Sequence, residues 1–345
     1  MTTGLAAGTA GVALPAVAGA SAPPALPMSP LPMSYLTTFG PAGDPVTRLG
    51  WGLGLVSIVV VVLVAVLLLW GLLKRRATPT DASALTVTRD AGGMSWIVIG
   101  VGFSSIVLVG CAVWTMFTVA AVAMPARASD LVVQVDAAQW WWSVRYLDPD
   151  PSRIFTTANE IHVPTGRPVR FELRSSDVIH SFWIPQLGGK MDVIPGQTNV
   201  MWLEASRPGV YRGQCGEYCG AQHAHMAMSV VADTPAVYDA WANGQRAAAA
   251  QSGDAVASRG QQVFLANCAA CHAVRGTGAG GILGPDLTHL ASRATIGAGL
   301  LPNSPGNLSA WIANSQALKP GSRMPSLTLS GPDLNAVVSW LGGLK

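Results

Sequence analysis

CGEYCGAQHAHM, residues 215–226, places two thiols, an imidazole and a thioether in one loop between apolar, strand-like runs. Soft transition metals select ligands of this kind. Zinc would normally require a second Cys or His pair at finger spacing, and the sequence has none. Copper bridged by the two thiolates, with imidazoles at the ends and a weak axial thioether, fits the set better. A disulfide between Cys215 and Cys219 is the plain alternative, favoured in an oxidising compartment.

The loop resembles that of subunit II of the haem-copper cytochrome c oxidases, which reads C-x-E-x-C-x-x-x-H-x-x-M and holds the dinuclear copper A centre. A second segment of that family is matched upstream by DVIHSFWIP, residues 177–185, followed by KMDVIPG, residues 190–196. The resemblance implies two bridging cysteines, one histidine on each copper, an axial methionine and a backbone carbonyl ligand. In that order, these are Cys215, Cys219, His180, His223, Met226 and Glu217.

The resemblance implies a second role for Glu217, as a carboxylate ligand of a magnesium or manganese ion shared with subunit I. A hard carboxylate suits such an ion. His162 and His225 receive no role, and we expect both to be surface or loop histidines.

Three consecutive tryptophans occupy residues 140–142. Side chains in a strand alternate between faces, so at least one must face outward, toward lipid headgroups, a partner subunit or an electron donor. The resemblance implies that Trp140 is the surface residue at which electrons from cytochrome c enter. Alternatively, all three anchor the domain at the membrane interface, as aromatic belts do. The family usually has His before Gln139, where this chain has Ala138.

Two apolar runs, residues 49–73 and 95–124, contain no charged residue. Each exceeds the ~20 residues that cross a bilayer as a helix, and the whole chain is only 11% charged, so we expect part of it to lie in lipid. The loop between the runs carries Lys74, Arg75, Arg76 and Arg89. The outer flanks offer mainly Arg48 and Arg127. The positive-inside bias therefore places the loop in the cytoplasm and both termini outside. The resemblance implies that the membrane is a bacterial inner membrane.

After the second run the pattern changes to short alternating stretches at residues 132–135, 169–174, 200–203 and 226–231, separated by Pro and Gly. This pattern predicts an antiparallel sandwich or barrel. The resemblance implies a cupredoxin-like Greek-key barrel with the copper loops at one end.

CAACH, residues 268–272, is a covalent haem c attachment motif, in which Cys268 and Cys271 add to the haem and His272 binds iron. The alternatives are a redox C-x-x-C and a zinc half-site. Neither explains the adjacent His, and no second zinc-binding pair follows the motif. Met324, in KPGSRMP, is the only Met after the motif and is the expected sixth ligand. His289 could compete, but it follows GPDLT, residues 284–288, which resembles the loop that supports the proximal His through a Pro carbonyl. Predicted helices at residues 254–267, 309–315 and 332–344 complete a small α domain of the class I cytochrome c type.

The sequence thus predicts a multidomain membrane protein of five regions. They are a disordered tail (1–47), a transmembrane helical hairpin (48–126), a cupredoxin-like copper A domain (127–233), a helix and flexible linker (234–252) and an all-α cytochrome c domain (253–345). Cys111 falls in the second apolar run, where an inert role is expected, and no cysteine remains for a structural disulfide.

The predicted function is electron transfer in a respiratory terminal oxidase. Electrons would pass from cytochrome c or a quinol-cytochrome c reductase through haem c and copper A to the dioxygen-reducing subunit I, with subunit III in the same complex and proton translocation coupled to the flow. No dioxygen-reducing site and no nucleic-acid partner are expected for this chain. The alternatives are the copper A subunit of a nitric oxide reductase and a stand-alone membrane-tethered electron carrier or copper-handling protein.

Overall fold

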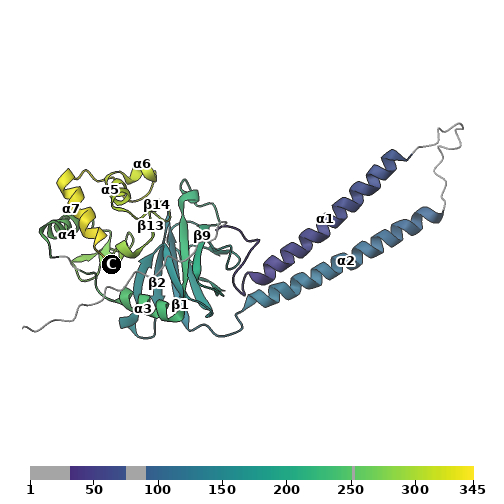
Figure 1. Ribbon diagram of the computed structural model, residues 1–345, viewed down its shortest axis with the longest axis horizontal. Coiled ribbons are helices and arrows are strands. Elements are labelled where there is room, and N and C mark those ends of the chain that lie inside the picture. Colours follow the sequence, from purple (N-terminus) through teal and green to yellow (C-terminus); the bar gives the residue numbers. More distant parts are fainter. Residues whose placement is uncertain (1–31, 75–90, 251–252) are drawn as a thin grey trace, which may run out of the picture.

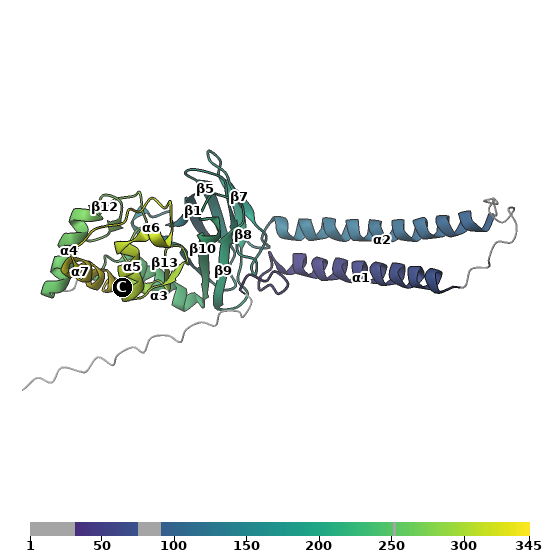
Figure 2. The same ribbon diagram turned by 90° about the horizontal axis from the view of Figure 1, so that it is seen from above.

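The computed structural model describes residues 32–74, 91–250 and 253–345. Two long helices, a β-sandwich and a small helical domain follow one another along its long axis (Figure 1). Seen from above, the helical domain lies on the side of the sandwich opposite to the long helices (Figure 2). Most of the predicted disordered tail and nearly all of the positively charged loop fall outside the described residues.

The long helices α1 (Asp44–Leu73) and α2 (Ala91–Ala123) form the predicted hairpin. Both are long and apolar enough to cross a membrane. No residue of α1 is buried, as expected of a helix that is apolar all round and faces lipid. The helix begins at Asp44, before residue 48 where the hairpin was predicted to start. Its first turn contains a proline, which is tolerated there because a missing N–H costs no hydrogen bond.

Close contacts hold the two helices of the hairpin to each other and to the sandwich. A Cβ on Gly52 of α1 would lie 2.2 Å from the Trp114 ring of α2, so a glycine is needed where the helices meet. At the sandwich end, the Trp202 indole donates a hydrogen bond to the Val122 carbonyl at 3.0 Å. A Cβ on Gly40, just before α1, would lie 2.0 Å from the Glu204 carbonyl oxygen. The hairpin is therefore joined to the sandwich by packing as well as by the chain.

The sandwich consists of two five-stranded sheets, with the orders β3-β2-β1-β5-β8 and β4-β10-β9-β6-β7. The strands are β1 (Leu131–Ala138), β2 (Trp141–Leu147), β3 (Phe155–Ala158), β4 (Glu160–Pro164), β5 (Val169–Ser175), β6 (His180–Trp183), β7 (Met191–Val193), β8 (Asn199–Leu203), β9 (Gly209–Cys215) and β10 (Ala227–Asp233). This is the expected cupredoxin-like architecture.

The alternating pattern predicted an antiparallel sandwich or barrel, but two strand pairs are parallel. β1 pairs with β5, and β4 with β10, in parallel. Alternation of apolar and polar residues reports which face of a strand is buried, but not the direction of the neighbouring strand. Parallel pairs also need long crossover connections, which a local pattern does not contain.

The core of the sandwich lies between the two sheets and reaches the end of the domain that carries His180. Phe171 of β5 and Phe182 of β6 bring the sheets together, with ring centroids 5.3 Å apart. Trp142 of β2 is fully buried. Its ring centroid lies 5.7 Å from that of Phe182 and 6.1 Å from that of His180. The alternative that Trp142 anchors the domain at the membrane interface is therefore wrong. Its ring instead packs beside His180.

The helical domain contains α4 (Ala255–Asn267), α5 (Pro305–Ala313), α6 (Ser315–Leu318) and α7 (Gly331–Gly342). α4 and α7 cross at Gly260, where a Cβ would lie 2.1 Å from the Ala336 carbonyl oxygen. Phe264 and Trp340 pack beside this crossing, with ring centroids 4.9 Å apart. Two small ribbons were not predicted, because strands of two residues carry no periodicity. They are β11 (Ala273–Val274) with β12 (Ala279–Gly280), and β13 (Thr295–Ile296) with β14 (Leu301–Pro302).

Helix α3 (Pro235–Arg246) follows β10 and packs on β4. Its Trp241 stacks on the His162 ring, with centroids 4.1 Å apart. The His162 ring nitrogens lie 2.6 Å from an Asp233 oxygen and 3.4 Å from a Glu160 oxygen. The prediction that His162 is a surface or loop histidine is therefore wrong. Burial opposes its charge, but the hydrogen bonds to Asp233 and Glu160 outweigh burial and raise the pKa of His162.

At pH 6, His162→Gln should lower stability by ~3 kcal/mol, because it leaves the buried Asp233 carboxylate and the partly buried Glu160 carboxylate without the charged imidazole. A raised pKa means that the stabilising charge is fully present below the unfolded pKa of about 6.5 and is lost as pH rises through the folded value. Melting temperatures of the full chain in detergent should thus differ most at pH 6 and converge at higher pH. His225→Gln, at an exposed position, is the control. Parallel wild-type and variant curves across this pH range would contradict the assignment.

Candidate metal centre and haem site

The loop of residues 215–226 is closed at its base by the antiparallel pair β9–β10. The Cys215 N–H donates a hydrogen bond to the Met226 carbonyl at 2.9 Å, so the two ends of the loop are fixed to each other. Within the loop, Gly220 has φ +115°, a conformation that side-chain-bearing residues rarely adopt, and residues 223–225 form a short 3-10 turn. The chain therefore folds back over itself and directs its ligand-type side chains to one point.

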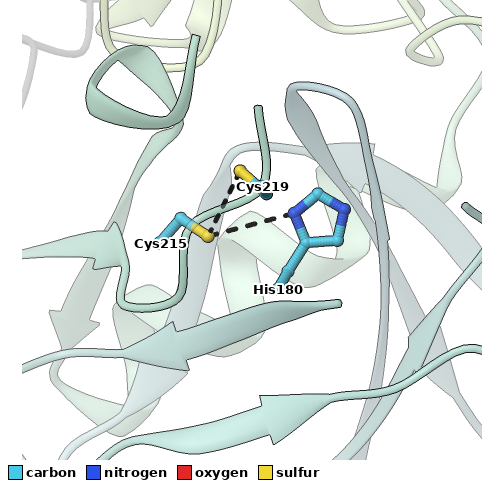
Figure 3. Close-up of side chains that lie close together, drawn as sticks. All are labelled: His180, Cys215 and Cys219. Atoms are coloured by element: carbon cyan, nitrogen blue, oxygen red, sulfur yellow. Dashed lines mark hydrogen bonds between the residues drawn. The ribbon is translucent and has the colours of Figure 1, made fainter. Parts of the chain in front are cut away.

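Two sulfur atoms form the centre of this cluster (Figure 3). Cys215 Sγ and Cys219 Sγ are 3.7 Å apart, well beyond the ~2.05 Å of a disulfide bond. All five cysteines are free thiols, so the structure does not contain the disulfide that was the plain alternative. The ligand atoms of Cys215, Cys219 and His180 all lie within 4.8 Å of one another and are buried.

The other predicted ligands lie against the same sulfurs. His180 Nδ1 is 3.9 Å from Cys215 Sγ, and the Glu217 carbonyl oxygen is 3.3 Å from it. His223 Nδ1 is 3.5 Å from Cys219 Sγ, and Met226 Sδ is 3.9 Å from it. The structure thus brings together all six residues that the resemblance named.

Asp177 sets the orientation of His180. Its carboxylate lies 2.9 Å from His180 Nε2, which leaves Nδ1 facing the sulfurs. The same carboxylate accepts hydrogen bonds from the backbone N–H groups of Gln139 and Val178, each at 2.7 Å. Burial opposes the charge of Asp177, yet these hydrogen bonds outweigh burial and lower its pKa. Carboxylates that hold the outer nitrogen of a metal-binding His in this way fix its tautomer and raise its basicity.

From the sequence, no role was predicted for Asp177, although an acid three residues before a candidate ligand could have indicated one.

The pKa values of the two thiols are shifted in opposite directions. The hydrogen bond from Cys219, together with His180 and nearby backbone groups, lowers the pKa of Cys215, whereas the neighbouring Cys215 and burial raise the pKa of Cys219. His180 is affected in turn: burial opposes its charge, but its hydrogen bonds to Cys215 and Asp177 raise its pKa. A bound metal ion would take the place of the thiol protons, since coordinating thiols are deprotonated.

The donor set fits a copper pair in its chemistry. Two thiols, two imidazoles, a thioether and a carbonyl are soft and borderline ligands, and such sets select copper over hard cations. His225 does not belong to the set, because its Nδ1 pairs with the Gln222 side chain at 2.7 Å. The Glu217 carboxylate, 45% exposed, lies 3.8 Å from Lys190 Nζ.

Trp140 is not the surface residue that the resemblance implied. It lies in the turn between β1 and β2, and only 7% of it is exposed. Its indole N–H donates a hydrogen bond to the Cys219 carbonyl at 3.0 Å. On its other side lies the helical domain: a Cβ on Gly321 would be 3.5 Å from the Trp140 ring. The sequence predicted that an outward-facing tryptophan would meet lipid headgroups, a partner subunit or a donor, whereas Trp140 is covered by a later part of the same chain.

The haem-attachment motif begins where α4 ends. Cys268 is the C-cap of α4, and His272 Nδ1 donates to the Pro285 carbonyl at 2.8 Å, the support that the resemblance implied. Burial lowers the pKa of His272, which favours the neutral, metal-binding imidazole. A Cβ on Gly284 would lie 2.6 Å from the His272 ring, so a glycine is needed there. Two free thiols beside a neutral imidazole with a free Nε2 fit covalent haem.

Their contacts distinguish Met324 and His289, the two candidates for the sixth ligand of the haem iron. The Met324 side chain packs at the edge of the helical core, and its carbonyl accepts hydrogen bonds from Ser315 at 2.8 Å and Gln316 at 2.6 Å. His289 is buried and its Nε2 lies 3.1 Å from the Ala247 carbonyl. His289 therefore secures the segment after α3, and Met324 stays the candidate for iron.

Comparison with known proteins shows which families the two cofactor domains resemble. Residues 145–233 match the family described as cytochrome c oxidase subunit II, periplasmic domain, and residues 257–345 match the cytochrome c family. The curated cytochrome c oxidase subunit 2 of Alkalihalophilus pseudofirmus is 43% identical, over 62% of this chain and 61% of its own length. The protein of the same name from Bacillus subtilis is 33% identical, over 64% of both chains. In both comparisons the chain spans less than two thirds of the relative.

A solved structure of the periplasmic domain of subunit II of cytochrome oxidase from Bradyrhizobium japonicum is 30% identical. The match covers 35% of this chain and 97% of that chain, with a TM-score of 0.33. Fold and sites together define a membrane-anchored protein with a copper-binding, cupredoxin-like domain followed by a cytochrome c domain. The chain is thus similar to cytochrome c oxidase subunit II in its copper domain, and its last domain matches the cytochrome c family.

We expect His223→Ala to lower the copper content of the full chain and to abolish the electron paramagnetic resonance signal of an electron shared between two coppers. His223 faces Cys219 Sγ, whereas His225 pairs with Gln222. His225→Ala is therefore the matched control and should retain both copper ions. Equal copper loss in the two variants would show that the wrong imidazole has been assigned.

Asp177→Asn should weaken copper binding ~10–100-fold, the usual effect of removing the carboxylate partner of a metal-binding His. The measurement is copper affinity by competition with a chelator. Asp192→Asn, on β7, is the control. Unchanged affinity in Asp177→Asn would mean that the cluster does not need Asp177 to orient His180.

Proposed function

We propose that the chain is the electron-transfer subunit of a terminal oxidase in a bacterial inner membrane. It would relay electrons from cytochrome c or a quinol-cytochrome c reductase, by way of haem c and copper A, to the dioxygen-reducing subunit I, with subunit III in the complex and proton translocation coupled to the flow. Both termini and both cofactor domains lie outside in this proposal. The names of the relatives favour an oxidase over a nitric oxide reductase subunit or a stand-alone carrier.

The site assignments form part of the proposal. Copper is held by His180, Cys215, Glu217 (carbonyl), Cys219, His223 and Met226; haem c is held by Cys268, Cys271, His272 and Met324. The exposed Glu217 carboxylate is assigned to a magnesium or manganese ion shared with subunit I, because a hard carboxylate suits such an ion.

The observation that carries the proposal is the position of Trp140. Its indole N–H bonds to the Cys219 carbonyl, while its ring lies against Gly321 in the loop that leads to Met324. One aromatic residue therefore touches both the loop with the copper-type ligands and the loop with the haem-type ligand. This position supports Trp140 as the point at which electrons enter the copper domain.

When bound, copper A and haem c supply the one-electron redox chemistry, with His/Met ligation giving a haem of raised potential. The protein side chains contribute geometry and the exclusion of water. Asp177 holds His180 and also the backbone of Gln139, next to Trp140, so one carboxylate positions both a ligand and the tryptophan turn. Trp140 is almost fully buried, which keeps water out of the contact between the two loops.

Electron transfer inside the full chain should be independent of protein concentration, because donor and acceptor sites are tethered. It should also depend little on ionic strength, although the domains are weakly complementary: residues 130–233 hold eleven acidic and eight basic residues, and residues 253–345 hold three and six. The measurement is flash photoreduction of the haem-loaded, copper-loaded chain while copper absorbance is followed.

Trp140→Phe is the paired variant and should slow this internal transfer. A rate that grows in proportion to protein concentration would show transfer between molecules and sink the proposal. An unchanged rate in Trp140→Phe would place the electron route elsewhere.

A further inference from the structure

Lys319 stands near the start of the loop that carries Met324, and only 3% of it is exposed. Its Nζ donates three hydrogen bonds to backbone carbonyls: to Trp140 at 2.8 Å, to His225 at 2.7 Å and to Gly297 at 2.8 Å. An ammonium group has three N–H donors, so all are used. Two acceptors belong to the copper domain and one to the helical domain. The side chain therefore links the two domains.

The three acceptors explain how a cation is kept in this buried place. Burying a charge without partners is very unfavourable, and burial lowers the pKa of Lys319 to about 7. Carbonyl oxygens accept hydrogen bonds but cannot donate them, so three of them favour the protonated, three-donor form. Separation of the domains would remove two of the three acceptors. The arrangement is complete only when the domains are docked.

Neighbouring contacts show that the docking surface is closely packed. Gln222, in the copper loop, donates to the Pro320 carbonyl at 3.0 Å. The Ala227 N–H donates to the Ala298 carbonyl at 3.0 Å. A Cβ on Gly299 would lie 2.9 Å from the Ala227 Cβ, so the two backbones approach as closely as they can. These contacts surround Lys319, which occupies the centre of the surface that covers Trp140.

We propose that Lys319 is a positioning residue that locks the Met324 loop onto the copper loop and thereby keeps Trp140 out of reach of soluble electron donors. A soluble donor would then reach the copper domain only through the tethered cytochrome c domain. This consequence for electron flow rests on the proposed function, whereas the docking itself does not. Docking is therefore measured separately from electron transfer.

The first test compares amine acetylation in the full, cofactor-loaded chain in detergent, followed by mass spectrometry. Lys345, at the exposed end of the same domain, is the internal reference. If the lock holds, Lys319 is acetylated at least about tenfold more slowly than Lys345. Acetylation of both lysines at similar rates would overturn the proposal without any variant having to fold.

The second test is hydrogen exchange in Lys319→Leu, with Lys345→Leu as the matched control and Lys319→Gln if the first variant does not fold. We expect exchange to rise about tenfold or more, the change that follows loss of one charge-assisted hydrogen bond. The rise should occur on both docking faces, residues 139–140 and 222–227 as well as 294–299. A purely local role for Lys319 would raise exchange only in residues 319–325. Unchanged exchange on the copper face would contradict the lock, whatever the electron-transfer rate.

Discussion

The site depends on one backbone hydrogen bond, from the Cys215 N–H to the Met226 carbonyl, at the base of the loop. It continues the β9–β10 ladder by one step and brings the first and last ligand-type residues of the loop side by side. The residues between these two ends are therefore confined to one short loop. Their ligand atoms therefore converge against the two sulfurs before any metal is considered.

A second layer of contacts couples this loop to the rest of the copper domain. Asp177 orients His180 and accepts a hydrogen bond from the Gln139 backbone, and Trp140 in turn bonds to the Cys219 carbonyl. These bonds form a ring of contacts around the sulfurs. Because each member is held by at least one neighbour, the centre is rigid, which suits a site that exchanges electrons without changing shape.

The docking of the cytochrome c domain extends this rigidity across two domains. Residues 247–249 are not the free linker that the alanine-rich sequence predicted: His289 bonds to the Ala247 carbonyl, and Ala249 bonds to the Arg275 carbonyl. The chain after α3 is thus packed onto the domain that it leads to. The tether limits where the domain can go, and the contacts around Lys319 select one position.

From the sequence alone, ligand spacing and apolar runs were enough to predict the hairpin, the β-rich domain, the haem motif and the loop ligands. Such features are local, because they depend on the order of neighbouring side chains. His180 was found through resemblance, and the burial of Trp140 and His162 was missed. Asp177, Lys319 and the parallel pairings β1–β5 and β4–β10 had no local signal. Only tertiary structure decided them, because a buried lysine on three carbonyls depends on residues 140, 225 and 297 meeting in space.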